Sequence, residues 1–120
     1  MSNKKSVIDF LDFTENENGK LMNDCLTAIR LQDPNKYHIG KQFIIRKINK
    51  GSTPPDILRT VEIIDIKTIK LENINEWIAR LDTGYEAKEC KNILRTMYSP
   101  KVQDIEIQEF YWILLKTIAK

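Results

Sequence analysis

The longest strand that the sequence predicts, Ile57–Leu71, limits the folds that this chain can adopt. Apolar residues recur along it, and their phase shifts at Ile63 and Ile64. A shift of this kind indicates a β-bulge or a bend around a barrel corner. We therefore expect a curved sheet in which this strand bends.

Turn signals divide the rest of the chain into short elements. The clearest helix is Ile74–Leu81, whose apolar residues recur at i, i+3, i+4 and i+7, with Asn73 and Glu76 as expected capping residues. The other expected elements are the strands Ser6–Phe13, Thr27–Leu31, Gln42–Ile48 and Ile105–Ile118 and the helices Lys20–Leu26 and Glu86–Tyr98. In a chain of 120 residues this order predicts one α+β domain, residues 1–120, with a curved, largely antiparallel sheet flanked by helices.

Composition excludes several classes of function. The formal net charge of +2 is too small to argue by itself for a nucleic-acid partner. Cys25, Cys90 and a single histidine cannot make a four-ligand zinc site, so we expect no metal and no other cofactor. Both cysteines are predicted to be reduced thiols of a cytoplasmic protein. Residues 1–13 lack the features of a signal peptide or a membrane span, and we expect no membrane partner.

The stretch Cys25–Arg46 gathers polar and basic side chains in a turn-rich crossing between two predicted strands. Irregular backbone at such a junction often carries function while the flanking strands hold it rigid. Residues 36–50 hold five basic residues and no acidic one, which fits either an anion-binding face or a solvated sheet edge. The candidate ligand-binding residues of this crossing are Arg30, Lys36, Tyr37, His38 and Lys41.

Arg30 and two tyrosines have side chains suited to a nucleotide. The guanidinium of Arg30 can hold a phosphate or a base edge bidentately, or it can pair with Asp33 or Asp82. Tyr37 and Tyr85 lie in predicted turns, where a phenol ring can stack on a base.

Several motifs, in this order and spacing, resemble one known family. They are the strand ending in Ile29-Arg30, a Gly-led turn into the next strand, the segment Lys70–Ile74, the turn Asp82–Tyr85 and the helix end Met97-Tyr98. Across roughly Phe10 to Leu115 the chain is similar to the ASCH domain of the PUA-like superfamily. The resemblance implies a PUA-like curved antiparallel β-barrel with flanking helices. It also implies a cleft for RNA or a nucleotide, in which Asp82, Thr83 and Tyr85 join the ligand-binding residues named above.

Small bacterial members of that family include amidohydrolases that deacetylate N4-acetylcytidine. Their sequences follow a pattern similar to Gly-x-Lys-x-x-Thr-x-Arg, with a Glu just before the Gly-aromatic turn. Aligned on Arg30, the Lys falls on Cys25, the Thr on Ala28 and the Glu on Thr83. Ala28 has no hydroxyl, and the neighbouring Thr27 is expected to point to the opposite face of the strand. This alignment therefore predicts that the catalytic positions are substituted.

Three candidates remain for any residual catalysis: Cys25, His38 and Asp82. Cys25 can act as a nucleophile with His38 as its base, or it can be an inert core thiol on the apolar face of a helix. His38 can equally be a turn residue that hydrogen-bonds to the backbone. Asp82 can replace the family's Glu if the backbone shifts.

Three functions are consistent with these residues, and the substituted amidohydrolase positions favour the first of them over an enzyme. The first is a non-catalytic module that binds RNA or a nucleotide-like small molecule. The second is a diverged amidohydrolase that acts on an acylated nucleoside or base. The third is a protein–protein adaptor in which the polar cluster is only surface.

Overall fold

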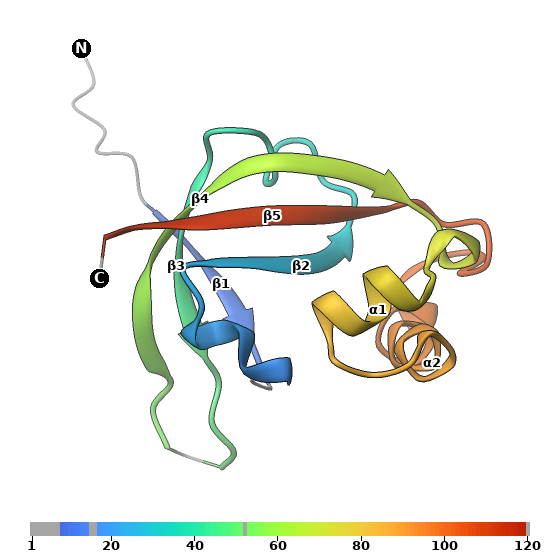
Figure 1. Cartoon of the computed structure of the whole chain (residues 1–120), viewed down its shortest axis with the longest axis horizontal. Coiled ribbons are helices and arrows are strands. Elements are labelled where there is room, and N and C mark those ends of the chain that lie inside the picture. The colour runs from blue at the N-terminus through green and yellow to red at the C-terminus, as the bar shows by residue number, and fades with distance from the viewer. Residues whose placement is uncertain (1–7, 15–16, 52, 120) are drawn as a thin grey trace.

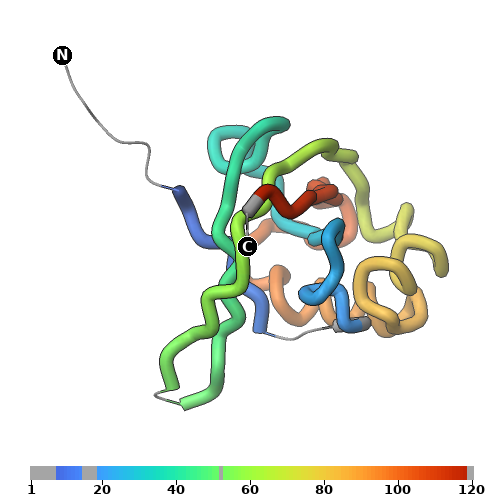
Figure 2. The backbone as a smooth tube through the Cα atoms, turned by 60° about the vertical axis from the view of Figure 1, so that its left-hand side comes forward, coloured from blue at the N-terminus to red at the C-terminus, as the bar shows by residue number. Residues whose placement is uncertain are grey.

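The computed structural model describes residues 8–14, 17–51 and 53–119. These residues form a curled, five-stranded mixed sheet in the order β1-β3-β4-β5-β2, with α-helices at one end of it (Figures 1 and 2). The strands are β1 (Asp9–Phe13), β2 (Cys25–Leu31), β3 (Gln42–Lys47), β4 (Asp56–Ile69) and β5 (Phe110–Ala119). The fold class is therefore α+β, as the sequence predicts.

Strand β4 is the longest and bends strongly (Figure 1). Its pairing with β5 shifts register between Ile63 and Asp65, where the apolar phase changes in the sequence. The predicted bulge is therefore confirmed. The bulge turns the second half of β4 so that the sheet curls into a half-barrel around a core that includes Phe43, Ile45 and Ile63.

The predicted antiparallel barrel needs one correction. Strand β1 pairs with β3 in parallel, while the other neighbours are antiparallel. The chain leaves β1 through a 3-10 helix, η1 (Glu17–Met22), and crosses to β2 on the far edge before it returns as β3. The two edge strands β1 and β2 thus face each other across a seam, and no backbone pairing joins them in the described part of the chain.

Helices α1 (Glu76–Asp82) and α2 (Ala87–Tyr98) pack beside this seam (Figure 1). Short 3-10 turns precede α1 (η2, Leu71–Asn73) and follow α2 (η3, Ser99–Lys101). A second buried cluster, which includes Leu94, Tyr98 and Phe110, joins the helices to the outer face of the sheet. No helix in the described part of the chain is long and apolar enough to cross a membrane.

Local expectations differ from the structure in a few places. The segment predicted as a helix, Lys20–Leu26, is the end of η1 followed by the start of β2. Helix α1 is capped by Asn75, whose side chain accepts from the backbone N of Ile78 at 3.0 Å, and not by Asn73. Trp77 is one of the recurring apolar residues of Ile74–Leu81, whose spacing predicts a place in the core, but it is 77% exposed; α1 begins at Glu76 and buries Ala79 and Asp82 instead. Residues 6 and 7 of the first predicted strand lie outside the described residues.

Candidate functional site

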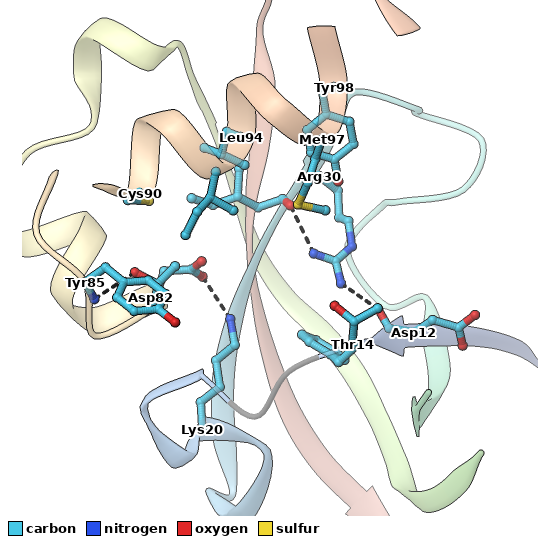
Figure 3. Close-up of a pocket in the computed structure, with 14 residues that line it drawn as sticks. Asp12, Thr14, Lys20, Arg30, Asp82, Tyr85, Cys90, Leu94, Met97 and Tyr98 are labelled. Atoms are coloured by element: carbon cyan, nitrogen blue, oxygen red, sulfur yellow. Dashed lines mark hydrogen bonds and ion pairs between the residues drawn. The ribbon is translucent and has the colours of Figure 1, made fainter. Parts of the chain in front are cut away.

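A cavity of about 480 Å³ lies where the seam meets the helices. Its walls come from the end of β1, from η1 and β2, from the turn between α1 and α2, and from the inner face of α2 (Figure 3). Volumes of this size are typical of small-molecule sites. We call it the seam cavity.

Asp82, the last residue of α1, is the centre of a buried polar cluster on the cavity wall. Its Oδ1 accepts a hydrogen bond from Thr27 Oγ1 at 2.6 Å and lies 3.4 Å from Lys20 Nζ. The side chains of Lys20 and Asp82 are only 5% and 6% exposed. Burying two charges is expensive unless they are paired, so this pair must hold a defined geometry. Lys20 and Asp82 line the cavity, whereas Thr27 stands behind the carboxylate.

Lys20 is held in place by contacts of η1 with the sheet. The Arg59 guanidinium in β4 donates to the carbonyl oxygens of Leu21 and Asn23, and its Nε donates to Thr117 Oγ1 at 2.7 Å. The Lys20 ammonium also lies 5.4 Å from the centre of the Phe13 ring. The backbone around Lys20 is therefore tied to β4 and β5, and its side chain is directed at Asp82 (Figure 3).

Arg30 stands across the cavity from Asp82 (Figure 3). Its Nη2 donates to the carbonyl oxygen of Asp12 in β1 at 3.0 Å, and its Nη1 donates to Ile29 O at 3.0 Å. The guanidinium carbon lies 4.9 Å from the centre of the Phe13 ring. Among the described residues no carboxylate forms an ion pair with Arg30, so neither of the expected pairings with Asp33 or Asp82 is present. Arg30 thus links β2 to β1 across the seam and presents positive charge to the cavity.

Tyr98, the last residue of α2, supplies its phenol group to the wall of the seam cavity that also carries Arg30. Burial raises the pKa of the Tyr98 phenol above its ordinary value, and the nearby Arg30 partly offsets that rise. At neutral pH the phenol is therefore uncharged and can donate a hydrogen bond.

The raised pKa of Tyr98 predicts a pH-dependent stability. The folded state keeps the phenol proton to a higher pH than the unfolded chain does. The contribution of the Tyr98 phenol to the free energy of unfolding is therefore complete below about pH 10, the ordinary pKa of tyrosine. It is lost as the pH rises through the pKa of the folded state. Urea unfolding at pH 8 and above pH 10 is expected to show a smaller alkaline loss for Tyr98→Phe than for the wild type. The half-exposed Tyr85→Phe is the control, and parallel curves for Tyr98→Phe and the wild type would contradict the argument.

The structure brings four of the predicted ligand-binding residues to one cavity. Arg30, Asp82, Thr83 and Tyr85 all line the seam cavity. Thr83 has a structural contact as well, because its Oγ1 donates to Ala79 O at 2.8 Å and accepts from the backbone N of Tyr85 at 3.0 Å. Strand β2 and the turn that begins at Asp82, more than fifty residues apart in the sequence, therefore meet at this cavity.

The other predicted residues lie elsewhere. Tyr37 is a core residue, 6% exposed, with its ring against Phe43 and Tyr111, so it is not a stacking platform on a turn. Lys41 pairs with Asp9 at 3.1 Å. His38 is exposed, and its Nδ1 lies 3.5 Å from Ile39 O. Lys36 is exposed and lines a second cavity beyond Arg30.

Cys25 is not on a helix but is the exposed first residue of β2. The loop that carries His38 is anchored to β4, where the backbone N of Gly40 donates to Ile63 O, and β4 lies two strands away from β2, which carries Cys25. Neither residue lines the seam cavity. The structure therefore does not bring the proposed nucleophile and base together.

Sequence reasoning missed Lys20 and Thr27. The sequence predicts a helix over Lys20–Leu26, which gives Lys20 no functional setting, and it predicts that Thr27 faces away from the site because it lies one position from the aligned Ala28. Thr27 does point to the face opposite Ala28, but α1 packs on that face and brings Asp82 to it. The signal that could have found them is the Gly19-Lys20 pair just before a strand that contains a threonine, read with a longer spacing than the family pattern.

Within the described residues no group of three or more His, Cys, Asp or Glu side chains could hold a metal ion. The charged and phenolic side chains on the cavity wall include Lys20, Asp82, Arg30 and Tyr98. Comparison with protein-family models, with curated proteins and with solved structures finds no match to this chain.

Proposed function

We propose that this chain is an ASCH-like domain of the PUA-like superfamily that binds an acylated nucleobase or nucleoside in the seam cavity and hydrolyses its amide bond. The observation that carries the proposal is the buried pair of Lys20 and Asp82 on the cavity wall, with Thr27 hydrogen-bonded to the Asp82 carboxylate from behind. A lysine, a threonine and an acid are the residue types of the amidohydrolase pattern. Here they meet in space although they do not fall at the aligned positions.

The geometry suggests a role for each side chain. Asp82 is the general base that takes a proton from a water molecule, and the resulting hydroxide attacks the amide carbonyl carbon. The Lys20 ammonium, 3.4 Å from Asp82, stabilises the negative charge that develops on the carbonyl oxygen. Asp82 then returns its proton to the leaving nitrogen as the C–N bond breaks. The products are a carboxylate and the free amine of the base. Thr27 is a positioning residue, because its hydrogen bond fixes the orientation of the Asp82 carboxylate.

The opposite wall suits the rest of the ligand. Arg30 and Tyr98 offer hydrogen-bond donors to a base edge, and Leu94 and Met97 of α2 offer apolar surface to a ring (Figure 3). Tyr85 is half-exposed at the rim, where its ring can stack on the ligand.

Non-catalytic binding of a nucleotide-like ligand is the second candidate. It is favoured by the guanidinium of Arg30, which lines the cavity with no carboxylate paired to it in the described residues. This function needs the same cavity but not the ion pair of Lys20 with Asp82.

Incubation of the purified chain with N4-acetylcytidine and a panel of other acylated nucleosides separates the two functions. Hydrolysis predicts equal amounts of acetate and cytidine by chromatography. Cys25→Ala is a control that is expected to keep full turnover, because Cys25 does not line the cavity. Saturable binding of cytidine without turnover of any panel member would favour the second candidate, and absence of both would overturn the proposed site.

A further inference from the structure

A second cavity, of about 440 Å³, adjoins the seam cavity. The two share Asp12, Arg30 and Tyr98 in their walls, so Arg30 and Tyr98 stand at the boundary between them. We call it the basic cavity. A ligand held in the seam cavity can therefore extend past Arg30 into the basic cavity.

The basic cavity is lined by three cationic side chains, Arg30, Lys36 and Lys101. Arg30 and Lys36 come from β2 and the loop directly after it, whereas Lys101 comes from η3, far away in the sequence. In the described residues neither lysine has an ion pair. Each ammonium instead lies near a tyrosine ring of the cavity. Lys36 Nζ is 5.4 Å from the centre of the Tyr37 ring, and Lys101 Nζ is 5.7 Å from the centre of the Tyr98 ring.

Two acids also line the basic cavity, but they reduce its positive charge only in part. Both carboxylate oxygens of Asp12 are already bonded to Arg46, at 2.8 and 2.9 Å. Asp33 accepts from the backbone N of Lys36 at 3.3 Å and remains a single negative charge against three positive ones. An anion that bears several acceptor oxygens is the ligand that this arrangement attracts.

We propose that the basic cavity binds the phosphate of a phosphorylated nucleoside whose base lies in the seam cavity. This inference rests on the proposed binding of a base-like ligand there, and it adds the substrate class: a nucleotide in preference to a free base or nucleoside. Arg30 contacts the ligand at the boundary, and Lys36 and Lys101 hold the phosphate oxygens.

The test measures binding of cytidine and of cytidine 5′-monophosphate by calorimetry at low salt. Neither compound carries an acyl group, so the result does not depend on turnover. The monophosphate is expected to bind at least about tenfold more tightly, because one or two charge-assisted hydrogen bonds are worth that much. The preference is expected to shrink in high salt, which screens exposed charges.

The Lys36→Gln/Lys101→Gln double variant is expected to lose the preference and to bind cytidine as the wild type does. Lys67→Gln/Lys116→Gln removes the same charge from exposed positions on β4 and β5 and is expected to keep the preference. Equal binding of the two ligands, binding of neither, or loss of the preference in both double variants would overturn the inference.

The two proposals fail separately. Turnover of N4-acetylcytidine without any preference for the monophosphate would leave the hydrolase proposal and remove the phosphate site. A preference that depends on Lys36 and Lys101, with no turnover of any acylated substrate, would leave the phosphate site and remove hydrolysis.

Discussion

Asp82→Asn is expected to reduce turnover of an acylated nucleoside by about 10²–10⁴-fold, the usual contribution of a general base. The amide side chain keeps the shape of the carboxylate and can still accept from Thr27 Oγ1, but it does not take a proton from water. The measurement is kcat at saturating substrate, with circular dichroism to show that the variant is folded. Turnover within about twofold of the wild type would remove Asp82 from the mechanism.

Two further variants keep this test decisive. Asp82→Asn takes a counter-charge away from the buried Lys20 ammonium, and breaking a buried pair can cost about 3–5 kcal/mol of folding free energy. If the single variant does not fold, Lys20→Met/Asp82→Asn removes both charges and is expected to fold without activity. Thr27→Val removes only the positioning hydrogen bond, so it is expected to lower kcat by up to about tenfold, and Thr27→Ser is expected to restore it.

Phe110→Ala is expected to lower the free energy of unfolding by about 3–5 kcal/mol, a large part of the stability of a small domain. Phe110 is 0% exposed and lies in the cluster that joins the helices to the sheet, with its ring centre 5.6 Å from that of Tyr98. Truncation leaves a cavity beneath α2, which forms one wall of the seam cavity. Urea denaturation measures the loss in unfolding free energy.

Phe10→Ala is the matched control for this prediction. Phe10 is 40% exposed and its ring stacks under the Arg46 guanidinium at 4.1 Å, so its truncation is expected to cost under about 1 kcal/mol. Equal losses for the two variants would contradict the assignment of Phe110 to the core between helices and sheet. Ligand binding by Phe110→Ala, measured where the variant is still folded, is expected to weaken as well.

Much of the fold could be predicted because its signals are local. The phase shift at Ile63 and Ile64 is a property of neighbouring residues, and it located the bend of β4. The periodic apolar stripe of Glu86–Tyr98 located α2 to within one residue. The parallel pairing of β1 with β3 could not be predicted, because it depends on where the chain crosses the sheet after β1 and not on the composition of either strand.

The candidate site was predictable only in part, for a related reason. Arg30 could be predicted from its place at a strand end, whereas Asp82, Thr83 and Tyr85 were expected at the site only because their turn resembles the ASCH family. Lys20 and Thr27 have no such setting, and their importance arises from the packing of α1 against β2. Tyr37 shows the opposite error, since a turn in the sequence gave no hint that its ring packs inward against Phe43.

The seam between β1 and β2 has a consequence for ligand entry. Backbone hydrogen bonds join the paired strands of this sheet. The edge strands β1 and β2 are instead linked by a side chain, because the Arg30 guanidinium donates to the Asp12 carbonyl oxygen. Giving up such a charge-assisted bond costs about 1.5–3 kcal/mol, far less than unzipping a strand. Parting β1 from β2 at this bond is therefore expected to cost less than separating any two paired strands of the sheet, and the ligand that we propose for the seam cavity would enter and leave along this line.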